Sequence, residues 1–233
     1  MKYTFNRELE SLKLQVMQMA VLVRQAVSDS YQAMVKRDGD LARAVILGDE
    51  NMDNLELQID DACLKMLALD QPVAHDLRFV IGSMQVADFL ESIADQAEKL
   101  AQRSLGLPDK PLLPYDPLME KLYIHVFEML EQVISAYNHE NEELARKVCE
   151  AEAEANSINN RILHEASLVM LNDPSQVEMQ VQKIIMARYL ERIADLAENA
   201  AMSVVLIKKG QNIKHIFKKK VNQQSAENKI GQE

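Results

Sequence analysis

One stretch of twelve residues occurs twice in the chain, and it constrains the fold more than any other feature. The first copy spans residues 87–98 and the second spans residues 187–198, so the copies lie 100 residues apart. With Ala101 and its counterpart included, nine residue types match at this offset. A match of this kind between otherwise different halves indicates an internal duplication.

Each copy contains two acidic residues at helical spacing. Glu91 and Asp95 are four residues apart, and their counterparts in the second copy have the same spacing, so each pair shares one face of a helix. Like charges at this spacing destabilise a helix by roughly 0.2–0.5 kcal/mol. The small residue Ala94 between the acids leaves room beside the carboxylates. A penalty that is present twice suggests that a cation compensates it.

The apolar residues of the chain recur at spacings of three and four, which predicts amphipathic helices and no strand. The chain is therefore expected to be all-α, with six helices in two tandem three-helix bundles related by the duplication. The predicted helices cover residues 5–37, 41–69, 72–105 (with Pro72 in the first turn), 117–138, a segment from about 143, and a segment from about 174 to 209.

Glycine and proline residues divide the chain into two predicted repeats. The segment 106–111 reads Gly-Leu-Pro-Asp-Lys-Pro and breaks the helical pattern, so the first repeat is assigned to residues 5–107 and the second to residues 114–210. Residues 211–233 are polar and rich in Lys and Gln, and this basic tail is expected to be disordered.

The middle helices of the two repeats add further acids. Residues 143–148 match residues 40–45 at an offset of 103, which places Glu152 opposite Asp49 and Asn156 opposite Asp53. If neighbouring helices pack antiparallel, these residues lie on the same face as the repeated acid pairs. Eight candidate metal ligands follow, four in each repeat: Asp49, Asp53, Glu91 and Asp95, and Glu152, Asn156, Glu191 and Asp195.

The candidate ligands offer oxygen atoms and no thiolate or imidazole. Such a set suits Mg²⁺, Ca²⁺, Mn²⁺ or ferric iron, and it suits Zn²⁺ or copper poorly. The alternative interpretation is an acidic helix face that is simply solvated. Asn156 replaces an acid and removes one charge, which makes the second cluster the weaker candidate.

Composition excludes several classes of protein. The net charge of −10 argues against a nucleic-acid-binding body, although six lysines lie close together in residues 208–220. No apolar run approaches the roughly 20 residues that span a bilayer, and the first residues lack the apolar core of a signal peptide. The two cysteines, Cys63 and Cys149, have neither metal-site nor disulfide spacing and are predicted to be core residues. A cytoplasmic protein is expected.

An enzymatic role finds little support in the sequence. None of the five histidines follows a glutamate at the Glu-x-x-His spacing of di-iron bundles, and the six glycines form no phosphate-binding loop. A non-enzymatic protein is therefore expected. Two alternatives stay open, a carboxylate-bridged metalloenzyme and a metal-free helical scaffold.

The motifs described above resemble those of the PhoU family of phosphate-uptake regulators. The resemblance covers about residues 5–216 and departs from the family pattern at Ser92 (usually Arg), Ala94 (more often Gly) and Asn156 (usually an acid). The segments that carry it are residues 49–53, 71–78, 90–95, 190–195 and 208–215.

The resemblance implies a fold and a role. It implies two three-helix bundles whose acidic motifs hold multinuclear clusters of iron, manganese, magnesium or zinc. It also implies a cytoplasmic, non-enzymatic homodimer that meets the membrane only through its partners. The implied partners are the ATPase of the phosphate ABC transporter and a sensor histidine kinase. When phosphate is plentiful, such an adaptor restrains uptake and keeps the phosphate-starvation response off.

Overall fold

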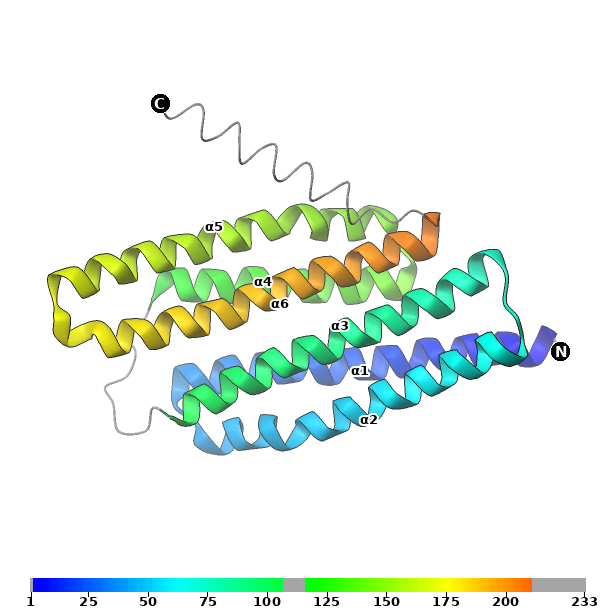
Figure 1. Ribbon diagram of the computed structural model, residues 1–233, viewed down its shortest axis with the longest axis horizontal. Helices are drawn as coiled ribbons and strands as arrows, with labels where there is room; N and C mark the ends of the chain where they lie inside the picture. The colour runs from blue at the N-terminus through cyan, green and yellow to red at the C-terminus, as the bar shows by residue number, and fades with distance from the viewer. Residues whose placement is uncertain (1, 107–115, 211–233) are drawn as a thin grey trace, which may run out of the picture.

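The computed structural model describes residues 2–106 and 116–210, which form six long α-helices and one 3₁₀ turn (Figure 1). No strand occurs in the described residues, so the prediction of an all-α chain with two tandem three-helix units is confirmed. The predicted tail 211–233 lies outside the described residues. The elements are α1 (Lys2–Lys36), α2 (Gly39–Leu69), α3 (Ala74–Leu105), α4 (Pro117–His139), α5 (Glu142–Asn172), η1 (Pro174–Gln176) and α6 (Val177–Lys209).

Short polar side chains and one glycine set the helix ends. The carboxylate of Asp38 accepts hydrogen bonds from the backbone amides of Asp40 and Leu41, at 3.1 and 3.0 Å, and so caps α2. Asp116 caps α4 in the same way. Gly210 has a φ of 69° and ends α6, where a left-handed residue without a Cβ atom carries no steric penalty.

The prediction that Pro72 lies in the first turn of the third helix is wrong. α3 begins at Ala74, and Pro72 lies in the connection that precedes it. The residue before a proline is disfavoured in the right-handed helical region, and Gln71 turns the chain with a φ of 49°. In the second repeat, Pro174 likewise opens the 3₁₀ turn η1 and not α6 itself.

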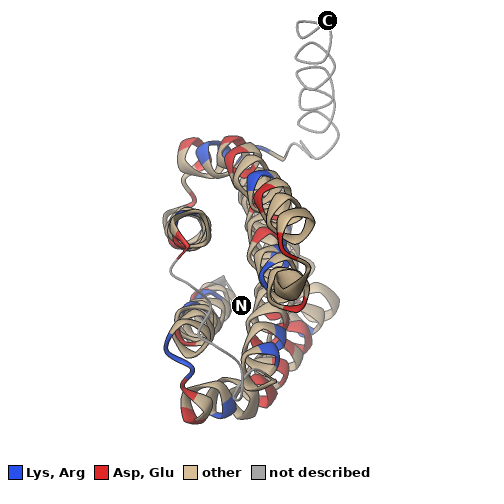
Figure 2. Cartoon of the chain, turned by 90° about the vertical axis from the view of Figure 1, so that its left-hand side faces the viewer, with Lys and Arg blue, Asp and Glu red and all other residues tan. Residues whose placement is uncertain are grey.

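The helices form two layers. α2, α3, α6 and α5 lie side by side in Figure 1, and α1 and α4 lie behind them; Figure 2 shows the same arrangement from the end of the molecule. α3 packs against α6 and α1 packs against α4, so both layers join the two repeats. The α2–α3 and α5–α6 connections lie at opposite ends of the molecule (Figure 1).

Apolar side chains from every helix fill the space between the layers. The periodic residues Val16, Ile59 and Leu190 are fully buried, which supplies the hydrophobic driving force for the fold. Cys63 and Cys149 are buried as well, which confirms their prediction as core residues. Burial raises the pKa of each thiol to about 12, so neither cysteine is a reactive thiolate at neutral pH.

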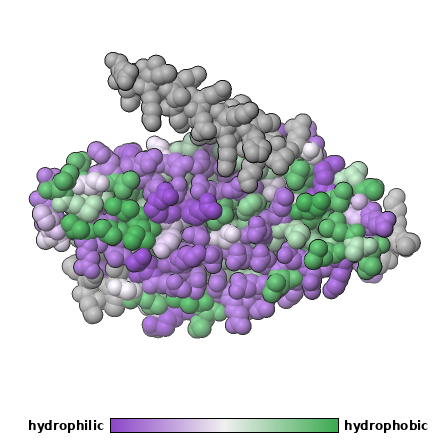
Figure 3. All heavy atoms as spheres, viewed as in Figure 1, coloured by the Kyte–Doolittle hydropathy of each residue, from purple (hydrophilic) through white to green (hydrophobic). Residues whose placement is uncertain are grey.

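The outer face that Figure 3 shows is polar across its middle and apolar towards its two ends. Exposed apolar residues lie near both inter-helix connections, Leu69 and Val73 at the end of α2, and Leu171 and Val177 between α5 and α6. No helix among the described residues combines the length and the hydrophobicity that crossing a bilayer requires.

Two kinds of contact hold the repeats together. Gly82 of α3 is buried where Ile207 of α6 lies directly over its backbone. Nearby, the hydroxyl of Ser203 donates a hydrogen bond of 3.1 Å to Gln85 Oε1. In the second layer, the rings of Tyr31 and Tyr123 stack with centroids 3.7 Å apart and so connect α1 to α4.

Substitution of Gly82 tests the importance of the α3–α6 contact. A Cβ atom at this position would come closer to Ile207 Cγ1 and Cδ1 than van der Waals contact permits. Gly82→Ala is therefore expected to lower the free energy of unfolding by about 1–3 kcal/mol, as measured by urea denaturation. In a double-mutant cycle, Ile207→Ala should relieve part of this loss, and strictly additive effects would contradict the proposed clash.

Candidate metal centres

The first candidate centre lies between α2 and α3. Carboxylate oxygens of Asp49, Asp95 and Glu98 lie within 4.8 Å of one another, and all three residues are partly buried. Asp49 comes from α2 and the other two come from consecutive turns of α3. Three negatively charged groups at this separation repel one another strongly unless a proton or a metal cation neutralises part of the charge.

Burial and mutual repulsion together shift the pKa values of acids in and beside this first centre. Partial burial, together with Glu98, Asp53 and Asp95, raises the pKa of Asp49 from 3.8 to about 6. Burial and the neighbouring acids, of which Asp95 acts most strongly, raise the pKa of Glu91 from 4.5 to about 7. A bound metal cation would stabilise such crowded carboxylates more than it would stabilise isolated surface acids.

One protein cation lies at the edge of the first centre. Lys99 Nζ lies 2.5 Å from Asp95 Oδ2, one helical turn along α3. This hydrogen bond is the main reason that the pKa of Lys99 is raised, and Tyr189 of α6 adds a smaller contribution. A metal ion on Asp95 would compete with Lys99 for the same carboxylate.

Of the four residues predicted in the first repeat, the structure brings Asp49 and Asp95 into the close group, while Glu91 and Asp53 are near enough to act on its charges. Glu91 and Asp95 lie on α3, and Asp53 is exposed at the outer edge of the group. Sequence reasoning missed Glu98, although its type recurs at residue 198 within the duplicated stretch. It also missed Glu56, whose pKa is raised by burial and then by Asp60, Asp88 and Asp53.

The second candidate centre lies between α5 and α6. Glu152 and Glu191 are almost completely buried, with 7% and 6% of their surface exposed. Burial, with Glu198, Asp195 and Glu191, raises the pKa of Glu152 to about 7. Burial and then Asp195 raise the pKa of Glu191, although two arginines oppose this effect.

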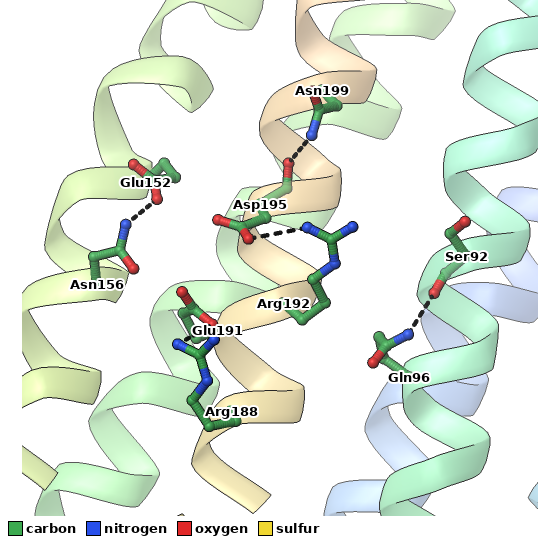
Figure 4. Close-up of polar contacts among 9 residues, drawn as sticks. All are labelled: Ser92, Gln96, Glu152, Asn156, Arg188, Glu191, Arg192, Asp195 and Asn199. Carbon is green, nitrogen blue, oxygen red and sulfur yellow. Dashed lines mark hydrogen bonds and ion pairs between the residues drawn. The ribbon is translucent and has the colours of Figure 1, made fainter. Parts of the chain in front are cut away.

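Protein donors already neutralise much of the second centre (Figure 4). Arg188 and Arg192 pair with Glu191 and Asp195, each with an N–O distance of 3.2 Å. The side-chain amide of Asn156 donates a hydrogen bond to Glu152 Oε1. Asn156 therefore points towards the group, as predicted, but it supplies an N–H donor to a neighbouring carboxylate.

The two centres differ because the duplicated helices have diverged around the shared acids. At the offset of 100 residues, Asp88 corresponds to Arg188 and Ser92 corresponds to Arg192. The first centre thus has an additional acid nearby and lacks both arginines. Among the described residues, the first centre alone has three potential ligand atoms close enough to share one ion.

The donor set of the first centre fits a hard cation. Its ligands are carboxylate oxygens, which Mg²⁺, Mn²⁺ and ferric iron prefer, and the three close oxygens come from two helices. The raised pKa values of Asp49 and Glu91 show that their ionised forms are disfavoured, and a bound positive charge would stabilise those forms. Zn²⁺ would be a poorer match, since it favours imidazole and thiolate ligands.

The raised pKa values predict how pH affects the metal-free chain. The native state binds more protons than the unfolded state from about pH 4 to about pH 7, because Asp49, Glu91 and Glu152 titrate at higher pH when folded. Stability is therefore expected to fall as pH rises through this range.

Urea denaturation of chelator-treated protein at pH 5 and pH 7.5 measures this effect. Glu91→Gln combined with Glu152→Gln should flatten the decline, because an amide does not titrate. Stability that rises with pH across the same interval would contradict the proposed repulsion between carboxylates.

Comparisons with known proteins agree with this fold and with the duplicated sequence. The PhoU domain model matches residues 16–104 and 119–204, one segment in each half of the chain. The phosphate-specific transport system accessory protein PhoU of Escherichia coli (strain K12) is 32% identical over 212 residues, which cover 91% of this chain and 88% of that protein. Its homologue in Aquifex aeolicus (strain VF5) is 35% identical over 90% of this chain and 95% of its own length.

Solved structures show the same architecture. The crystal structure of PhoU from Pseudomonas aeruginosa superposes with a TM-score of 0.85 at 30% sequence identity, covering 89% of this chain and all of that chain. The phosphate transport system regulatory protein PhoU from Streptococcus pneumoniae, 23% identical, shares the fold with a TM-score of 0.81. The duplicated acidic helices, the two matched segments and the relatives that match over most of their length together show that this chain belongs to the PhoU family.

Proposed function

We propose that this chain is a non-enzymatic, metal-binding adaptor that negatively regulates phosphate uptake and phosphate-starvation signalling. The observation that carries the proposal is membership of the PhoU family over nearly the whole chain, with relatives named as accessory proteins of phosphate-specific transport. In this role the chain links the ATPase of a phosphate ABC transporter to a sensor histidine kinase. It acts in the cytoplasm as a homodimer and reaches the membrane only through these partners.

The described residues support an adaptor better than an enzyme. Both cysteine thiols are buried with raised pKa values, so they offer no accessible nucleophile. The ligand group of the first centre is made of carboxylates alone. By contrast, the exposed surface presents long helices with polar and apolar areas, which suit contacts with other proteins (Figure 3).

The proposed metal role is to neutralise the acids that connect neighbouring helices. Asp49, Asp95 and Glu98, with Glu91 and Asp53 beside them, would hold iron, manganese, magnesium or zinc in the first centre. Glu152, Glu191 and Asp195, with Asn156, would form a weaker second centre, because arginines already balance part of its charge. A metal bound to two helices at once would stabilise the packing between them.

Metal analysis of isosteric variants tests the first centre. Asp49→Asn combined with Asp95→Asn should remove most of the bound manganese or iron, as measured by inductively coupled plasma mass spectrometry. Saturating Mn²⁺ at about 100 times Kd should stabilise the native chain by about 2.7 kcal/mol, which raises Tm by roughly 5–10 °C. The double variant should lose this shift.

A matched control separates a specific site from general acidity. Glu8→Gln combined with Glu10→Gln removes two charges from an exposed part of α1 and should leave metal content unchanged. Equal metal content in the Asp49/Asp95 variant and in the unmodified chain would refute the site. A Tm that is the same with and without chelator would favour the metal-free scaffold.

The regulatory role requires a test in cells. A tagged copy is captured from cells grown in high and in low phosphate, and co-purified proteins are identified by mass spectrometry. The expected result is recovery of a phosphate-transporter ATPase or a sensor kinase, with more recovered in high phosphate. Recovery of neither protein under either condition would overturn the adaptor proposal.

A further inference from the structure

A separate cavity of about 230 Å³ lies between the last turns of α3 and the first half of α6. It is therefore at the joint between the two repeats, next to the first candidate metal centre but not part of its ligand group. Its walls come from both helices: Lys99, Gln102, Arg103, Gly106, Gln182 and Tyr189.

The lining of this cavity is cationic. It contains Lys99 and Arg103, and no carboxylate is among its lining residues. Arg103 is partly buried, and its guanidinium makes no hydrogen bond or ion pair with any described residue. Elsewhere in the protein the net charge is strongly negative, so an unpaired guanidinium beside a cavity points to an anion as its partner.

One wall also carries a hydrogen-bond acceptor without a donor. Gln182 Oε1 is buried and has no hydrogen-bond partner among the described residues. An unsatisfied buried acceptor is destabilising, and a hydrogen bond from a ligand donor would remove this cost. The cavity thus combines positive charge for an anion with one acceptor for a ligand that also carries a proton.

The duplication supplies an internal comparison. At the offset of 100 residues, Lys99 and Arg103 correspond to Asn199 and Ser203, and Gln182 corresponds to Gly82. At that second position Ile207 packs over Gly82, and Ser203 bonds to Gln85. The position around Gly82, which is equivalent to the cavity, is therefore uncharged and filled by the side chain of Ile207. The duplicated fold does not itself require a cavity at the position of Gln182.

We propose that the α3–α6 cavity binds a phosphate group, either as inorganic phosphate or as a small phosphate monoester. Arg103 would donate two parallel hydrogen bonds to phosphate oxygens, with Lys99 and the Tyr189 hydroxyl as further donors. A rotation of the Gln182 side-chain amide would bring the buried Oε1 into the cavity, where it would accept a hydrogen bond from a protonated phosphate oxygen. Phosphate retains such a proton near neutral pH and sulfate does not.

The proposed phosphate site is linked to the first metal centre through Lys99. In the metal-free chain Lys99 pairs with Asp95, so a metal ion on Asp95 would release the ammonium group towards the cavity. Metal is therefore expected to tighten phosphate binding, and phosphate to tighten metal binding by the same factor. This link rests on the proposed metal function, whereas the cavity and its charge do not.

Equilibrium dialysis of the full chain with radiolabelled inorganic phosphate, in Mn²⁺-loaded and chelator-treated forms, tests the site. One phosphate per chain is expected, with the lower Kd in the Mn²⁺-loaded form. Arg103→Gln should raise Kd about tenfold or more, because a charge-assisted bidentate contact is lost. Arg161→Gln removes an exposed arginine of α5 whose side chain pairs with no residue that the structure describes, and it is the matched control, for which no change is expected.

Two results would overturn the phosphate site. One is the absence of phosphate binding in both metal states. The other is phosphate binding that Arg103→Gln leaves unchanged, since phosphate would then bind away from this cavity. A lower Tm of that variant would then mean that Arg103 only stabilises the end of α3.

Competition experiments examine the ligand more closely. Unlabelled phosphate should displace the labelled phosphate at a much lower concentration than sulfate does. Gln182→Leu should reduce this difference between the two anions. Circular dichroism of the variant should show an unchanged helical content. Equal displacement by both anions in the unmodified chain would overturn the role of Gln182 Oε1. O-phosphoethanolamine distinguishes the two sources: displacement indicates that esters enter, and its failure restricts the site to inorganic phosphate.

Metal content is measured on the same dialysed samples. Phosphate bound by a chain that takes up no Mn²⁺ in the Mn²⁺-treated sample would contradict the metal proposal and support the anion site. Metal bound without phosphate would overturn this inference and leave the metal proposal intact.

Discussion

The close approach of α3 and α6 is the contact on which the rest of the structure depends. Gly82 permits it, because a side chain at this position would meet Ile207. Each of these helices carries the acid pair of its own repeat, and each presents that pair to the preceding helix, α2 or α5. One packing contact therefore fixes the relative position of both candidate metal centres and forms the walls of the cavity between the repeats.

The duplicated acids have different charged partners in the two repeats. In the first repeat, Asp49, Asp95 and Glu98 lie close together with Lys99 as a nearby cation, and the pKa values of Asp49 and Glu91 rise. In the second repeat, Arg188 and Arg192 lie one turn from the acids, and Asn156 replaces one of them. The same helical framework thus holds one group of acids with a single lysine beside it and one in which two arginines pair with two of the acids.

Sequence reasoning predicted the parts of the structure that depend on local pattern. Helical periodicity predicted six helices, and the acid spacing placed Asp49 and Asp95 in one group but missed Glu98. Pro72 was predicted to lie inside the third helix, but it precedes the helix. The position of a proline in the sequence does not reveal the left-handed turn at Gln71. The contact of Lys99 with Asp95 and the cavity beside Arg103 depend on how α3 packs against α6, which no local pattern specifies.

The arginines of the second repeat have a consequence for how the chain responds to metal supply. Arg188 and Arg192 lie on the same helix as the acids they pair with, so these charges balance within α6 without a bound ion. α2 and α3 have a single lysine in this position. If the first centre holds a metal ion as proposed, the packing of α2 on α3 would depend on metal supply, whereas the packing of α5 on α6 would depend on it much less.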